Sequence, residues 1–344
     1  MVCAGSQVFA RPRGAMLELT MAVNKINEAR LRLIQKRQLR DAWGKDYQAA
    51  IWATPAEAPS ISTPTILHPA KLGGRPMHTL SRPETWSALL ALYHPRVWDI
   101  HEQRMLFPGP RPHFLDGHPL TVGQAFKPLR GTVAVAEEMG RLSKHPKCRV
   151  RQGALEVWAP FPYIGDLLLF IHDSLGPHVL NWTIKDKDED FHRRGPTPGR
   201  PQTKNVDLSA LQRHALEATY YQDAGIRTQQ VAGREIDSTL RANLNRLFLS
   251  HAEPVQLAPA VCLKLCDHFQ QSVGGSTPAY KLVSEAAQHL GVELLVLKNV
   301  LEQGIWNRRI HVDLFEPVVL DRPLKPQRND PLDVYGDWFA RGAL

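Results

Sequence analysis

The sequence is short of paired cysteines, long apolar runs and familiar catalytic signatures, and each shortage excludes a class of protein. Of the four cysteines, only Cys262 and Cys266 lie close together. A zinc site needs about four ligands, commonly supplied as two short-spaced pairs, and a second pair is missing. We therefore expect both thiols to be small apolar groups on a buried helix face.

No apolar run is long enough to cross a bilayer. The longest pure stretches, 88–93 and 167–171, are far shorter than the roughly 20 residues that a transmembrane helix needs. The first twenty residues contain Arg11 and Arg13 and no apolar segment of the kind found in a secretion signal. We therefore expect a soluble protein of the cytoplasm.

Several signatures of catalysis are absent as well. The sequence contains no G-x-S-x-G elbow, Walker loop, G-x-G-x-x-G fingerprint or H-E-x-x-H pair. The dipeptide His101-Glu102 begins like the last of these, but position 105 is Met. These absences turn attention to carboxylates and lysines as the groups that carry any chemistry.

Acidic residues are outnumbered by basic ones, 34 to 42, which gives a formal net charge of +8. The excess is concentrated in the segment 25–45 and in the acid-free segment 193–204. Such clusters suit contact with phosphates, and the alternative is a solvated helix face. The side chains that we assign to nucleic-acid contact are Lys36, Arg37, Arg40, Arg193 and Arg194.

A length of 344 residues allows two or three domains. We expect a basic helix and a Pro-rich linker over 1–80, a first globular domain over 81–205, a second over 206–320 and a Pro-rich tail over 321–344. The tail is expected to dock on a partner or to stay mobile. The expected helices are 81–93, 132–142, 208–224, 237–249, 260–271, 278–290 and 293–303. The expected strands are 96–101, 154–159, 163–171, 178–185, 226–231, 309–315 and 317–320.

Three helices followed by two extended segments, at the end of the second domain, is the order of a winged-helix module. Its third helix offers Lys298 as its cation, whereas a helix that enters a DNA groove normally carries several. We therefore expect this module to contact protein subunits more than DNA.

A carboxylate and a lysine stand at the ends of two adjacent predicted strands. Asp166 precedes the apolar run 167–171, and Lys185 follows the run 179–184. If the two segments pair, both charges meet near one end of the sheet, where a metal ion or a phosphate would satisfy them. Carboxylates that hold Mg²⁺, beside a lysine that orients water, suit phosphodiester hydrolysis. The alternative for Lys185 is a solvated ion-pair network with the acids of 186–190.

Four blocks in this order resemble the TnsA family, the endonuclease subunit of heteromeric Tn-seven-type transposases. The blocks are Ser81-x-x-Glu84, the strand 97–103, the hairpin with Tyr163-x-x-Asp166 and 183–185, and the helix–strand segment 216–226. The resemblance covers roughly residues 80–305. It implies an α/β restriction-endonuclease-like catalytic domain, with a mixed sheet flanked by helices, followed by an α-rich winged-helix domain.

The resemblance also implies a function and its site. The family cuts double-stranded DNA at the 5′ ends of a mobile element during cut-and-paste transposition in bacteria, at the nucleoid. Its cofactor is Mg²⁺, with Mn²⁺ as a substitute, and its partners are an integrase-type transposase subunit and an AAA+ ATPase regulator. Carried over to this sequence, the catalytic residues are Glu84, Asp166 and Lys185, and the metal ligands are Glu84 and Asp166.

Departures from the family pattern keep alternatives open. Thr183 stands where nucleases of this fold carry Glu or Gln, which leaves the carbonyl of Ile184 as a further ligand and favours a catalytically decayed DNA-binding scaffold as the alternative. His101 replaces an Arg, and the segment between Gln103 and Asp166 is longer than usual. A stand-alone restriction or repair nuclease is a further alternative.

The assignment of the helix acid has competitors of its own. Glu84 is also the acid of a capping box opened by Ser81, a role that needs no metal. Glu102 and Gln103, which follow the strand at 96–101, are alternative ligands.

Overall fold

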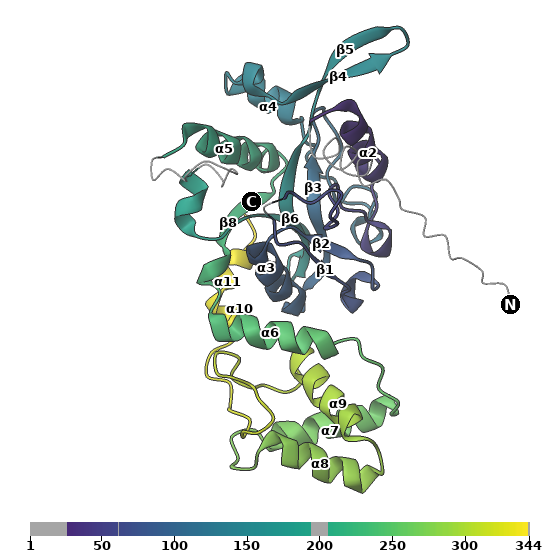
Figure 1. Cartoon of the computed structure of the whole chain (residues 1–344), viewed down its shortest axis with the longest axis vertical. Coiled ribbons are helices and arrows are strands. Elements are labelled where there is room, and N and C mark those ends of the chain that lie inside the picture. The colour runs from purple at the N-terminus through teal and green to yellow at the C-terminus, as the bar shows by residue number, and fades with distance from the viewer. Residues whose placement is uncertain (1–25, 61, 194–205, 343–344) are drawn as a thin grey trace, which may run out of the picture.

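The computed structural model describes residues 26–60, 62–193 and 206–342. Its centre is a four-stranded mixed sheet with the strand order β3-β6-β7-β8 (Figure 1). The first two pairings, β3–β6 and β6–β7, are antiparallel, and β7–β8 is parallel. The strands of this sheet are β3 (Val97–Leu106), β6 (Tyr163–Asp173), β7 (Gly176–Lys185) and β8 (Arg227–Ala232). The prediction of an α/β fold with a mixed sheet flanked by helices is confirmed.

Helices cover both faces of the sheet, which explains the continuous apolar runs in its central strands. Leu167 and Leu169 of β6 pack on the side of α3 (Arg82–Tyr93). Leu168 and Phe170 belong to the opposite core, with α5 (Leu208–Gln222) and α2 (Glu28–Gln38). Successive side chains of a strand point to opposite faces, so one strand builds two cores.

The remaining elements surround this sheet or extend from it. Two small sheets pair β1 (Thr65–Leu67) with β2 (Met77–Thr79) and β4 (Lys147–Gln152) with β5 (Leu155–Pro160). The other helices are α4 (Thr132–Glu138), α6 (Ser238–Ser250), α7 (Pro259–Gln271), α8 (Ala279–Leu290), α9 (Leu294–Trp306), α10 (Pro331–Val334) and α11 (Gly336–Phe339). Most predicted helices are found within a few residues, whereas the strand β4 was not predicted.

The predicted division of the chain needs three corrections. A boundary at 205 would divide the sheet, because β8 follows it in sequence and pairs with β7. Helix α5, which also follows it, packs on one face of the same sheet. The segment before residue 81 packs on the same body, since the Gln38 amide donates to the carbonyl of Gln103. The tail is also held by its own chain: the Trp182 indole donates to the carbonyl of Trp338, and Arg341 pairs with Asp173.

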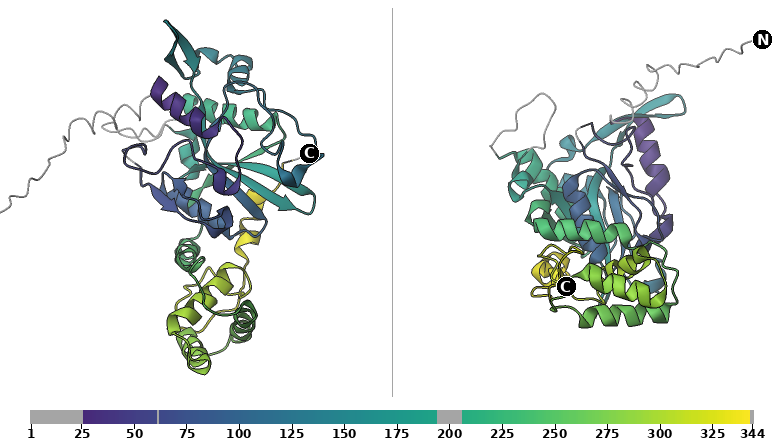
Figure 2. Two further views of the ribbon diagram at one scale, coloured as in Figure 1. Left: turned by 90° about the vertical axis from the view of Figure 1, so that its right-hand side faces the viewer. Right: turned by 60° about the horizontal axis from the view of Figure 1, so that its bottom comes forward.

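The predicted winged module is found only in its helices. Helices α7, α8 and α9 form a layer beyond α6, away from the sheet (Figures 1 and 2). The two strands expected at 309–315 and 317–320 do not form: this described segment contains one isolated bridge, between Val312 and Pro326. On α7, Cys266 is buried as expected and Cys262 is partly exposed. Among the described residues, no helix combines the length and apolar character needed to cross a membrane.

Candidate active site

Glu84 is fixed at the start of α3 by local hydrogen bonds. Ser81 is the N-cap, and its hydroxyl accepts from the Glu84 backbone N–H. The Glu84 carboxylate in turn accepts from the Leu80 N–H at 2.8 Å and from the Ser81 hydroxyl at 2.8 Å. The predicted capping role is therefore present. The side chain is also buried and aimed at the sheet, where the amide of Gln103 donates to it at 2.9 Å.

Asp166 and Lys185 lie at the same end of the central hairpin, where both line one cleft, as the apolar runs predict. Leu167 lies opposite Trp182, so Asp166 comes next to the last residues of β7. One Asp166 oxygen accepts from the Ile184 N–H at 2.6 Å, and the other has no donor within the described parts of the chain.

Lys185 makes no ion pair with any described carboxylate, which argues against the predicted network with the acids of 186–190. Asp186 pairs instead with Arg234, and Glu189 with Arg193. The Lys185 ammonium is therefore free to contact a ligand in the cleft.

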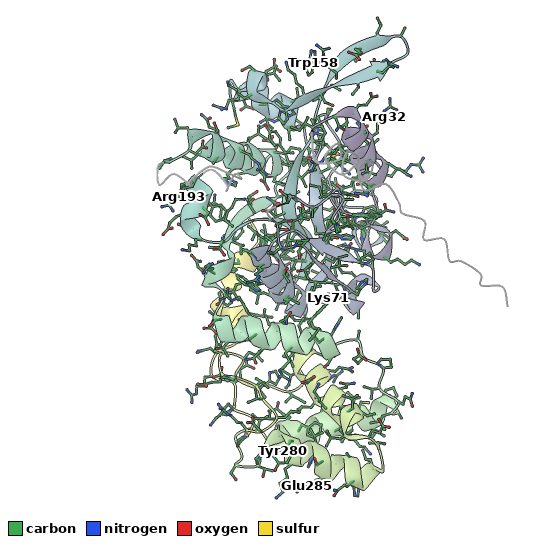
Figure 3. The ribbon with its side chains drawn as sticks, in the orientation of Figure 1. Arg32, Lys71, Trp158, Arg193, Tyr280 and Glu285 are labelled. Atoms are coloured by element: carbon green, nitrogen blue, oxygen red, sulfur yellow. The ribbon has the colours of Figure 1, made fainter. Side chains whose placement is uncertain are left out.

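The three predicted residues line one open cleft of about 610 Å³. Glu84 comes from α3, Asp166 from β6 and Lys185 from β7, so three separate elements converge there. The rim of the cleft carries cations beside the acids Asp186 and Asp190, and Figure 3 shows one of its arginines, Arg193, at the side of the molecule. The rim cations are Arg82, Arg193, Arg213 and Arg234.

Like charges in this cleft make ionisation of Glu84 unfavourable. Burial, followed by the negative charge of Asp166, raises the pKa of Glu84 from 4.5 to about 7. The ammonium of Lys185 opposes the shift only weakly. A carboxylate kept beside a second carboxylate, without a compensating arginine, is the arrangement that a cation would stabilise.

Gln103 holds Glu84 from a strained backbone position. Its φ is +49°, which is uncommon for a residue other than glycine and rare inside a strand. This conformation turns the Gln103 carbonyl toward the N–H of Ala50, while the side-chain amide reaches Glu84. Local strain of this kind gathers at functional sites. Gln103 therefore positions the Glu84 carboxylate.

Glu217 of α5 is a further acid near the site that sequence analysis did not select. It is buried behind β7, where the Asn181 amide and the Thr183 hydroxyl each donate to it at 3.0 Å. Burial and the charge of Asp166 raise its pKa. A sequence signal existed, because Glu217 lies three and four residues before Tyr220 and Tyr221, on the same face of the helix.

Glu102, the alternative to Glu84 as a metal ligand, is already fully bonded within the protein. Its side chain is wholly buried and forms a two-bond ion pair with Arg75, at 2.9 Å for each bond. The N–H of His78 completes its hydrogen bonds at 3.1 Å. Glu102 therefore stabilises the fold, away from the cleft.

The predicted nucleic-acid contacts fall into three groups. Arg37 is held inside the protein by Glu57 and lies over the ring of Trp52, with 6% of its side chain exposed. It is withdrawn from the candidate DNA contacts for that reason. Lys36 and Arg40 are exposed on and just after α2, and Arg193 lines the cleft. Arg194 lies outside the described residues.

Comparisons with known proteins assign the chain to no family. No family model matches it, and no curated protein is detectably similar. The resemblance seen in the four sequence blocks therefore stays a prediction, and a functional assignment depends on the geometry of the cleft.

Proposed function

We propose that this chain is a Mg²⁺-dependent DNA endonuclease subunit of a transposase, which hydrolyses phosphodiester bonds at the 5′ ends of a mobile element. The observation that carries the proposal is the convergence of Glu84, Asp166 and Lys185 in one open cleft. Glu84 belongs to a helix that is far in sequence from the hairpin of Asp166 and Lys185. Their meeting at one point supports a common role in place of three separate structural roles.

The donor groups suit Mg²⁺, which usually binds proteins through one or two carboxylates and fills its other positions with water and substrate phosphate. Asp166 offers an oxygen without a donor, and Glu84 carries a carboxylate whose ionisation needs a neighbouring positive charge. The described residues contain no group of three His, Cys, Asp or Glu side chains that could hold a metal. The chain alone would thus supply only two carboxylates and the expected carbonyl of Ile184, and the phosphate of bound DNA would supply further ligands to Mg²⁺ or Mn²⁺.

A bound divalent ion would polarise the phosphate and lower the pKa of water. The residues of the chain supply the rest. The unpaired ammonium of Lys185 faces the same cleft, where it would orient water and neutralise charge that develops on phosphate oxygens. Gln103 keeps Glu84 in place, and the exposed Arg82 and Arg213 would contact phosphates beside the cut.

A scaffold subunit with a decayed site is the second candidate, and Thr183 is the observation that favours it. Its hydroxyl is turned to Glu217 and its side chain is buried, so β7 presents no acid there to the cleft. In either role we propose an integrase-type transposase subunit and an AAA+ ATPase as partners. Genes for these two proteins beside this one would support a transposase subunit, and their absence a stand-alone nuclease.

The experiment that tests the proposal compares E84Q with E102Q. Each full-length variant is assayed for Mg²⁺-dependent 5′-end cleavage with the subunits encoded beside its gene, and rates are corrected for the folded fraction. We expect E84Q to lose cleavage, because glutamine keeps hydrogen bonds but removes the charge that a metal needs. E102Q should cut at the rate expected from its folded fraction. Active E84Q with inactive E102Q would reverse the assignment.

A further inference from the structure

The hairpin of β4 and β5, residues 147–160 and here called the arm, extends from the sheet body at the end opposite to α7–α9 (Figure 1). Its strands pair in regular register from Lys147–Pro160 to Gln152–Leu155. Gly153 opens the two-residue turn with a φ of +64°, a conformation that favours glycine and matches the twist of a tight hairpin. The arm is therefore a built, regular ribbon.

The two faces of the arm differ in character. Cys148 and Val150 point inward and join the core that contains Leu31 of α2. The alternate residues of β4 are cations, and all of them are exposed: Lys147, Arg149 and Arg151. Residues two apart in a strand are about 6.6 Å apart along it, so the three charges form an evenly spaced row.

An exposed tryptophan lies among these cations. Trp158 pairs across the hairpin with Arg149 and is 58% exposed. The Lys147 ammonium and the Arg149 guanidinium lie 5.2 and 5.3 Å from its ring. Such contacts attract the cations to the indole while leaving them open to solvent. Figure 3 shows Trp158 on the arm and Arg32 of α2 at the same end of the molecule.

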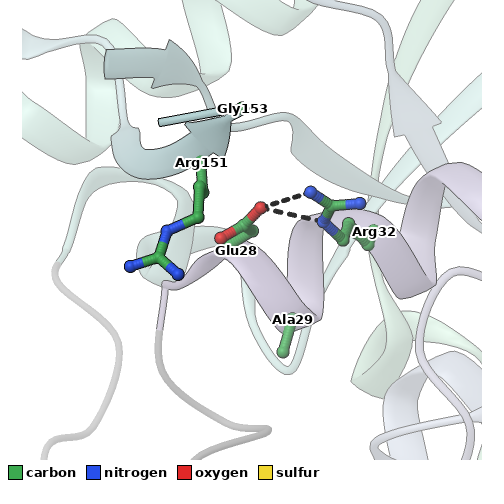
Figure 4. Close-up of a pocket in the computed structure, with 5 residues that line it drawn as sticks. All are labelled: Glu28, Ala29, Arg32, Arg151 and Gly153. Atoms are coloured by element: carbon green, nitrogen blue, oxygen red, sulfur yellow. Dashed lines mark hydrogen bonds and ion pairs between the residues drawn. The ribbon is translucent and has the colours of Figure 1, made fainter. Parts of the chain in front are cut away.

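Acidic groups near the arm leave its positive charge largely in place. Glu156 faces Arg149 at 3.4 Å, but both side chains are more than half exposed, and such pairs are weak. Glu28 of α2 lies near Arg151 across an open hollow, and it is already bonded by Arg32 (Figure 4). Lys147 and Arg151 have no ion pair with any carboxylate in the described parts of the chain.

We propose that the outer face of the arm binds the sugar–phosphate backbone of duplex DNA, away from the cleft. A row of exposed cations with an exposed indole complements a polyanion that also presents apolar sugar surface, and a two-stranded ribbon fits the major groove. The inference deepens the proposed function, on which it rests for the choice of DNA over an acidic protein. The arm would anchor DNA that flanks the cut without reading its sequence.

The test measures binding of the full chain to a fluorescent duplex in EDTA, so that cleavage plays no part. The variant K147Q/R149Q/R151Q is compared with K264Q/K281Q/K325Q, which removes three exposed lysines from the C-terminal part of the chain. Each phosphate contact contributes about 0.9 to the slope of log K against log salt. We expect the arm variant to lose about 2 to 3 from this slope and to bind at least tenfold more weakly at about 0.1 M salt. The control should match the wild type, and both should keep its unfolding midpoint.

D166A separates this inference from the proposed function. Because Asp166 lines the cleft, which no residue of the arm lines, D166A should lose cleavage and keep the wild-type slope. If the arm variant keeps the wild-type slope, or loses no more than the control, the arm does not bind DNA, whatever the cleavage results. If the arm variant loses slope while wild-type protein never cuts DNA, the arm proposal stands and the nuclease proposal fails.

Discussion

Two buried carboxylates, Glu102 of β3 and Glu84 of α3, have opposite surroundings although Gln103, the residue after Glu102, donates a hydrogen bond to Glu84. Glu102 is matched by an arginine with two parallel bonds and a backbone N–H. Glu84 accepts only neutral donors and lies near a second carboxylate. The first charge is satisfied by the fold itself, whereas the second is satisfied only if something positive enters the cleft. Burial alone therefore does not separate these two acids, whereas the arginine that only Glu102 contacts does.

The largest contrast is expected from D166A, which removes the oxygen that has no donor. We expect 5′-end cleavage to fall by roughly a thousandfold or more, as for loss of a principal charge-stabilising group. The folded state should keep or gain stability, because Glu84 loses a like charge nearby. Cleavage rate and urea unfolding of the same preparation check both parts. Normal cutting by D166A with Mg²⁺ would mean that the cleft is not the active site.

E102Q tests the other half of the comparison, the claim that Glu102 stabilises the fold through its ion pair with Arg75. The substitution leaves the Arg75 guanidinium buried without its anion, and removal of one partner of a buried pair costs about 3 to 5 kcal/mol. We expect the free energy of unfolding in urea to fall by this amount at neutral pH. A loss below about 1 kcal/mol, as for exposed pairs, would show that the fold does not depend on this ion pair.

The pH dependence of stability should report the raised pKa of Glu84 when E84Q is compared with the wild type. The pKa of Glu84 is raised in the folded state, so its carboxyl is tolerated below pH 4.5 and destabilises the protein as pH rises through about 7. In metal-free buffer, E84Q should therefore gain stability over the wild type across this window, by up to about 3 kcal/mol. Saturating Mg²⁺ should reduce the gain. A difference between E84Q and wild type that does not change with pH would contradict the shifted pKa.

The smallest effect is expected at Lys298 of α9, the third helix of the predicted winged module. Its ammonium lies 2.8 Å from the buried Glu302, which Arg246 and Ser250 also contact. The cation of α9 is therefore engaged inside the protein. K298Q should leave the salt slope of DNA binding unchanged and lower the free energy of unfolding by about 1 kcal/mol. A slope smaller by about 0.9 would assign a phosphate contact to α9.

The candidate site was predictable because local patterns fix it. The capping pattern from Ser81 places Glu84, and the equal apolar runs around one turn set the hairpin that brings Asp166 to Lys185. The contact of Glu217 with Thr183 was not predictable, since it depends on how α5 packs across the sheet. Sequence alone likewise could not pair Arg37 with Glu57 in the Pro-rich segment.

The domain boundary failed for a related reason. The Pro- and Gly-rich segment 193–204 has the composition of a linker. Two parallel strands, however, need a crossover of a dozen or more residues, usually with a helix. The segment therefore belongs to the connection between β7 and β8, together with α5. A fragment that begins at 206 would take a strand from the sheet, so DNA binding is best tested in the full chain.

The most direct test of the account is calorimetric titration of the metal-free full chain with Mn²⁺. We expect the wild type and E102Q to bind the ion, with E102Q corrected for its folded fraction, and D166A and E84Q to lose binding at least tenfold. The affinity should also rise with pH through about 7, as Glu84 gives up its proton. Equal binding by the wild type, D166A and E84Q would contradict a metal site formed by these two carboxylates.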